Sequence, residues 1–142
     1  MSELPRRRPF AALREIDPPR TIAVTGTLDL ASICGLQDEL YSVIAAGDGR
    51  LIVDLSRVRL CDAAAMSGLV QVSQHCREQG GWLRLAHPVG IVATAFQIVS
   101  FGLYVEVYRT VSAAAVGAPD DRIMRSGWSG PARGSRTGDR DA

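Results

Sequence analysis

The sequence of 142 residues contains no lysine: all 16 residues of the Lys and Arg types are arginine. This absence excludes the P-loop lysine of nucleotide-binding proteins, the catalytic lysine of kinases and any Schiff-base lysine. The catalytic signatures Gly-x-Ser-x-Gly, His-Glu-x-x-His and Gly-x-Gly-x-x-Gly are absent as well. The sequence therefore favours a protein that is not an enzyme and that needs no cofactor.

The central part of the chain lacks an excess of positive charge. The net charge is +1, and residues 21–117 carry six arginines against eight acidic residues. A nucleic-acid-binding domain usually carries a basic stripe on the domain itself, so we expect no nucleic-acid partner. The run Arg6-Arg7-Arg8 near one end is typical of a solvated terminus.

Long hydrophobic runs and paired metal-ligand spacings are also missing. No stretch approaches the ~18 apolar residues of a membrane span, and no secretory signal precedes the three cysteines, so we expect a soluble, cytoplasmic and reduced protein. Cys61, His75, Cys76 and His87 could be imagined as zinc ligands, but no Cys-x2–4-Cys or His-x3–5-His spacing supports such a site. We therefore expect the cysteines to be small core residues and expect no metal.

Alternating strand and helix patterns run through residues 10–116 and predict one α/β domain. The expected strands are 10–17, 21–28, 50–55, 82–86 and 103–108, and the expected helical segments are 32–49, 63–79, 88–100 and 110–116, with Ser32 capping the first of them. This order predicts a mixed sheet of about five strands, with parallel central strands and interleaved helices. Residues 1–9 are expected to form a flexible arm, and residues 117–142, rich in Gly, Ser, Arg and Asp, a disordered tail.

Three aspartates, Asp29, Asp54 and Asp62, fall at or near predicted strand ends. Ligands bind at such ends in open α/β sheets, so these side chains could hold Mg²⁺ for phosphoryl transfer. That chemistry also needs a lysine to steady the phosphoryl group, and the chain has none. Helix caps and loop residues are therefore the favoured interpretation.

The stretch "RLCDAAAMSGL", residues 59–69, joins a strand to a helix. Asp62 can accept hydrogen bonds from the first amides of that helix, and the same turn is a favourable place for a phosphate. A serine there would be a natural switch, because phosphorylation adds ~1.5–2 negative charges beside the carboxylate. The chain instead carries three alanines, Ala63 to Ala65.

Three blocks of the sequence point to a family. "TGTLD" (25–29) matches a Gly-x-Leu-Asp motif, "LIVDLSRVRLCDAAAMSGL" (51–69) matches Asp-Leu-Ser-x-Val followed by Asp-Ser-Ser-Gly-Leu, and "VYRTVSAA" (107–114) matches the usual end. Over roughly residues 10–115 the chain resembles the STAS domains, specifically the small bacterial anti-sigma factor antagonists. The resemblance implies a cytoplasmic, non-catalytic domain that binds an anti-sigma factor of the ATP-binding serine kinase type.

The phosphoacceptor serine of that family corresponds to Ala64, so the usual phosphorylation cannot occur at this position. Ser67, about one helical turn on, is a weak substitute acceptor, and a serine so placed more often faces solvent or bonds to the backbone. By the resemblance, one set of residues would form the partner-binding surface: Thr27, Asp29, Asp62, Ala63, Ala64, Met66 and Ser67. The helical spacing of Met66 with Leu69 and Val70 also fits a core residue.

Other functions remain open at this level. Stand-alone STAS subunits also dock on the ATPase of lipid-type ABC transporters, and others belong to signalling scaffolds. An alanine at the switch position fits both a constitutively active antagonist and a degenerate copy. The sequence also leaves open whether the chain forms a homodimer.

Overall fold

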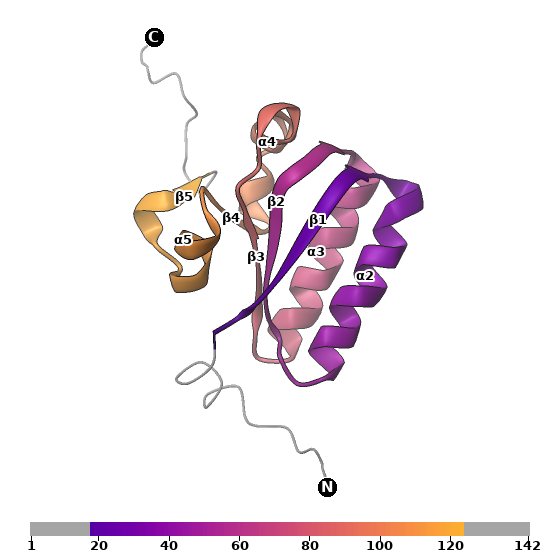
Figure 1. The fold of residues 1–142 in the computed structure, drawn as a ribbon, viewed down its shortest axis with the longest axis vertical. Coiled ribbons are helices and arrows are strands. Elements are labelled where there is room, and N and C mark those ends of the chain that lie inside the picture. Colours follow the sequence, from indigo (N-terminus) through magenta and orange to yellow (C-terminus); the bar gives the residue numbers. More distant parts are fainter. Residues whose placement is uncertain (1–17, 124–142) are drawn as a thin grey trace, which may run out of the picture.

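Five strands form one mixed sheet, in chain order, in the computed structural model, which describes residues 18–123 (Figure 1). The strands are β1 (Arg20–Leu28), β2 (Arg50–Cys61), β3 (Trp82–Ala86), β4 (Glu106–Tyr108) and β5 (Arg122–Ile123). Strands β1 to β4 are parallel, and β5 is antiparallel to β4. The expected α/β fold is confirmed. The strand expected at residues 10–17 and the arm at residues 1–9 lie outside the described residues.

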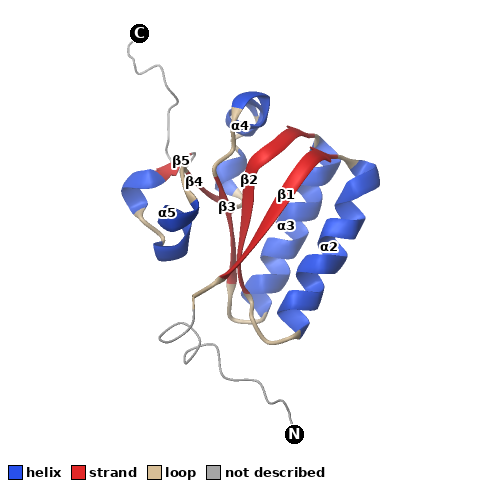
Figure 2. Cartoon of the chain, viewed as in Figure 1, coloured by secondary structure: helices blue, strands red, loops and turns tan. Residues whose placement is uncertain are grey.

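Four α-helices and two short 3-10 turns connect the strands. The helices are α2 (Leu30–Ala45), α3 (Ala63–Glu78), α4 (Gly90–Ile98) and α5 (Val111–Val116), and the turns are η1 (Phe101–Leu103) and η2 (Pro119–Asp121). Helices α2 and α3 lie side by side on one face of the sheet, and α5 covers the other (Figure 2). Within residues 18–123, no helix combines the length and the apolar character that crossing a membrane requires.

Alternation along β2 divides its side chains between two hydrophobic cores. Leu51, Val53 and Leu55 belong to the larger core, under α2 and α3, whereas Ile52 belongs to the smaller core under α5. All four side chains are fully buried. Burial on both faces explains why the first half of β2 reads as a continuous apolar run.

Some boundaries differ from the sequence prediction. Strand β2 continues to Cys61 instead of ending at residue 55, because β1 pairs with it through two register shifts up to its last residue. Strand β4 is shorter than predicted, because η1 occupies the chain before it.

Part of the segment expected to be a disordered C-terminal tail from residue 117 has regular structure. Residues 119–123 instead form η2 and β5, held by the pairing of β5 with β4 and by a hydrogen bond from the Arg109 N–H to the Asp121 carbonyl oxygen at 2.9 Å. Ile123 packs against the larger core. Residues 124–142 lie outside the described part of the chain.

A glycine in α3 sets how closely α2 and α3 approach. A Cβ atom added at Gly68 would overlap Cγ1 of Ile33, which is buried in α2. On the same side, Gln37 Nε2 donates to the Gly68 carbonyl oxygen at 3.0 Å. The two helices therefore pack so closely that a side chain at this position would force Ile33 to move.

Replacing Gly68 with alanine is expected to lower the free energy of unfolding by about 1–3 kcal/mol, the usual cost of overpacking a core. Gly35→Ala in α2 is the matched control, because a Cβ atom there meets nothing within 4 Å. That control is expected to stabilise the protein by ~0.5–1 kcal/mol through helix propensity. Urea denaturation measures both changes, and equal effects would contradict the close helix contact.

Candidate functional site

Two strand–helix junctions lie next to each other at one edge of the sheet. Leu28 and Cys61 are paired at the ends of β1 and β2, and the Asp62 N–H donates to the Leu28 carbonyl oxygen at 3.1 Å. Helices α2 and α3 begin directly after these residues. The structure therefore brings the predicted segment around Thr27 and Asp29 beside the predicted segment that starts at Asp62.

Asp29, and not Ser32, is the N-cap of α2, which corrects the sequence prediction. The Asp29 carboxylate accepts from the Ser32 N–H at 3.0 Å, and the Ser32 hydroxyl oxygen accepts from the Asp29 N–H at 3.0 Å. The Ser32 hydroxyl also donates to the Thr27 carbonyl oxygen at 2.9 Å. This reciprocal capping box fixes the backbone of the loop and leaves the Thr27 side chain exposed.

Asp62 caps α3, as the sequence predicts: its carboxylate accepts from the Ala65 N–H at 2.9 Å. Ala63 and Ser67 are exposed and Ala64 is half-buried, so these three residues face solvent on the first turns of the helix. Met66 differs from them, because only 8% of its surface is exposed and it belongs to the larger core. The predicted surface therefore combines exposed small residues with one core residue at its margin.

An apolar groove runs along α3 from this point. Its volume is about 550 Å³. From α3 it is lined by Ala63, Met66, Ser67, Val70, Gln71 and Gln74, and from the chain after α4 by Val99, Phe101 and Tyr104. None of these described lining residues is charged. Val99 and Tyr104 remain 49% and 57% exposed, so the groove presents apolar surface to solvent.

Sequence reasoning missed Val99, Phe101 and Tyr104 as parts of this surface. A signal was present, since residues 88–105 contain no charged residue at all. The pattern of that stretch predicts a helix followed by a strand, and neither element by itself shows that its apolar side chains lie beside α3.

Each of the three aspartates that could hold Mg²⁺ by their predicted positions accepts a hydrogen bond from a different backbone N–H. Asp29 and Asp62 cap two helices, whereas Asp54 lies within β2 and accepts from the Ser56 N–H at 3.0 Å. Asp54 is therefore not at a strand end, contrary to the sequence prediction.

The four residues considered for zinc also have separate surroundings. Cys61 and Cys76 are buried; burial and the Asp62 charge raise the pKa of Cys61 to about 11, and burial raises that of Cys76 to about 12. His75 packs edge-on against Tyr41, with ring centroids 5.2 Å apart, and His87 is exposed in a loop with a φ of 60°. Within residues 18–123, no group of three His, Cys, Asp or Glu side chains could hold a metal ion.

The family model of the STAS domain matches residues 11–114 of the chain. A search of the curated proteins with this sequence found no match. Three solved structures are similar in fold: a candidate anti-sigma factor antagonist from Thermotoga maritima, the anti-sigma factor antagonist SpoIIAA in its unphosphorylated form, and a sulfate transporter family protein from Wolinella succinogenes.

The similarity to these structures covers most of each chain at low sequence identity. The Thermotoga protein has a TM-score of 0.62 and 16% identity, over 75% of this chain and 98% of its own. SpoIIAA has a TM-score of 0.59 and 17% identity, over 74% and 92%. The Wolinella protein has a TM-score of 0.56 and 20% identity, over 70% and 84%.

Two substitutions of Asp62 distinguish the effect of its capping hydrogen bond on stability from the effect of its negative charge. Asp62→Ala removes the acceptor for the Ala65 N–H and is expected to cost about 1 kcal/mol of folding stability, whereas Asp62→Asn keeps a good N-cap and is expected to stay close to the wild type. The measurement is the midpoint of urea denaturation for both variants. An equal loss in the two would mean that the charge, and not the cap, is what stabilises α3.

Proposed function

The chain belongs to the STAS domain family, and we propose that it is a non-catalytic anti-sigma factor antagonist. In this proposal it captures an anti-sigma factor of the ATP-binding serine kinase type in the cytoplasm, which frees a sigma factor and regulates transcription. The likeness in fold to SpoIIAA supports the proposal. The motif at residues 25–29 and the Asp-Leu-Ser-x-Val motif at residues 54–58 match the antagonist pattern and support it further, whereas only Asp62 of the Asp-Ser-Ser-Gly-Leu block is present.

The observation that carries the proposal is an uncharged start of α3 that opens directly into the apolar groove. Ala63 and Ser67 are exposed and also line the groove. The groove continues to Tyr104, an aromatic side chain with 57% of its surface exposed. Protein interfaces have cores that are depleted in charge and enriched in aromatic and methionine side chains, which is the composition found here.

The position of Ala64 explains why this surface stays uncharged. A phosphate at this position would place ~1.5–2 negative charges two residues from Asp62 and next to Ala63, which lines the apolar groove. Alanine has no hydroxyl to accept that group. The proposed antagonist therefore holds the binding-competent surface permanently, unless the exposed Ser67 takes over as acceptor.

A role in transport is the second candidate. The similarity to the Wolinella sulfate transporter family protein supports it, because that protein shares the fold over 70% of this chain. In that case the same groove would dock on a transporter component, such as the ATPase of a lipid-type ABC transporter. The identity of the captured partner distinguishes the two functions.

The Ala64→Asp variant is expected to lose at least about tenfold in affinity for the anti-sigma factor, because the new carboxylate would be desolvated in an apolar contact. The matched control is Ala45→Asp. It adds the same charge at an exposed position at the C-terminal end of α2, whereas the candidate surface lies at the N-terminal ends of α2 and α3. Affinity capture from cell extract, with bound proteins identified by mass, tests both variants. Unchanged capture by Ala64→Asp would remove the start of α3 from the interface.

The Ala64→Ser variant is expected to restore the phosphoacceptor. When it is incubated with ATP and the captured anti-sigma kinase, its intact mass should increase by one phosphoryl group, whereas the wild type should not change. Mass spectrometry of both proteins decides the matter. A mass increase in the wild type would show that another hydroxyl, Ser67 first, is modified, and would contradict a surface that cannot be switched.

A further inference from the structure

A second hollow opens where the short strand β4 leaves part of β3 uncovered. Strand β4 begins at Glu106, which pairs with Arg84, so Trp82 and Leu83 have no β4 residue opposite them. The resulting notch has a volume of about 210 Å³ and lies between the last turns of α3, the start of β3, residues 102–106 and β5. It is separate from the alanines at the first turn of α3.

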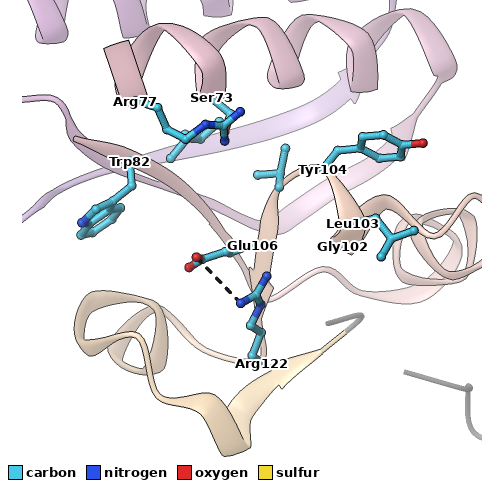
Figure 3. A pocket seen from close by; sticks show the side chains of 10 residues that line it. Ser73, Arg77, Trp82, Gly102, Leu103, Tyr104, Glu106 and Arg122 are labelled. Atoms are coloured by element: carbon cyan, nitrogen blue, oxygen red, sulfur yellow. Dashed lines mark hydrogen bonds and ion pairs between the residues drawn. The ribbon is translucent and has the colours of Figure 1, made fainter. Parts of the chain in front are cut away.

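Two arginines enter this notch from opposite sides. Arg77 reaches in from α3 and Arg122 from β5 (Figure 3). Glu106 is the one carboxylate among the described lining residues, and its charge is already engaged. It accepts from Arg84 Nε at 3.0 Å and from the Tyr108 hydroxyl at 2.7 Å. The notch therefore has an excess of positive charge.

Hydrogen-bond donors of the notch remain unused. Ser73, with 2% of its surface exposed, accepts from Arg77 Nη1 at 2.9 Å, and its hydroxyl proton has no acceptor within residues 18–123. Arg122 Nη1 forms an ion pair with Glu106 Oε2 at 3.8 Å, which is longer than a hydrogen bond, and its buried Nε has no hydrogen-bond partner in the described part of the chain. Both guanidinium groups therefore keep N–H donors that the described contacts do not use, and so does the Ser73 hydroxyl.

We infer that this notch binds the phosphate group of a small phosphate monoester. A guanidinium group offers parallel N–H donors that match phosphate oxygens, and a phosphate presents three acceptor oxygens, enough for both arginines and the hydroxyl. The volume is below the ~300–1,000 Å³ of pockets for drug-sized ligands, so the rest of the molecule must be small.

Aromatic side chains provide a place for the organic part of such a ligand. Trp82 and Tyr104 both line the notch. The Arg84 guanidinium lies 3.7 Å from the centroid of the Trp82 ring, which fixes the ring and covers one of its faces. Tyr104 also lines the apolar groove, so a bound ligand would lie one side chain away from the proposed partner surface. The inference does not depend on the proposed function, since it rests on the notch alone.

Fluorescence of Trp82 tests the inference in the full-length chain. Trp128→Phe removes the other tryptophan, so that Trp82 is the one reporter. Titration with phenyl phosphate at constant ionic strength is expected to give a saturable change in its emission. Phenol and benzoate are the controls for the aromatic ring and for a carboxylate. No saturable change, or an equal response to phenol or benzoate, would overturn the inference.

Charge-neutral variants identify the binding residues. In the same background, Arg77→Gln and Arg122→Gln are each expected to weaken phenyl phosphate binding at least about tenfold, the effect of losing a hydrogen bond to a charged group. Arg59→Gln, at an exposed position of β2 outside the notch, is the matched control and should bind like the parent. Because Arg77 is exposed on α3, its variant is expected to fold normally. Equal weakening by Arg59→Gln would reduce the effect to net charge and overturn the inference.

Discussion

The hydrogen bond between the Asp62 N–H and the Leu28 carbonyl oxygen joins the two places where a strand becomes a helix. Parallel strands that are paired to their last residues end at the same edge of a sheet, so the helices that follow them must start side by side. Both aspartates that end these strands are used as caps. Backbone hydrogen bonds and the two caps therefore fix the shape of the candidate partner surface. Its exposed side chains do not have to hold this shape, so they can be small.

Helix α3 links the two hollows of the molecule. Residues between Ala63 and Gln74 line the apolar groove, and Ser73 and Arg77 line the notch. On the side of α3 that packs against α2, Gly68 allows the close contact of the two helices. The close contact of α3 with α2 fixes the place of both hollows relative to the sheet.

The sequence predicted the order of strands and helices because apolar periodicity is local and was strong in β2, α2 and α3. It also predicted Asp62 as a cap, since a cap acts within one helical turn. It named Ser32 as the first cap and gave Asp29 only the general interpretation of a cap or loop residue, because the two residues stand three positions apart and form one reciprocal box. It could not predict the groove, because Val99 and Tyr104 reach α3 only through tertiary packing. Residues 119–123 were missed for the same reason: β5 has two residues and depends on its partner strand.

The apolar side chains around the groove have a consequence for the protein on its own. Ile98, Val99, Leu103 and Tyr104 are 49–77% exposed, and the net charge of the chain at pH 7 is only +1. Electrostatic repulsion between copies is then weak near the isoelectric point of about 7.8, while contact between apolar patches is favourable. The colloidal stability of the free chain is lowest under these conditions, and any molecule that covers the patch raises it. The solubility of this protein therefore depends on whether a binding partner covers the apolar patch.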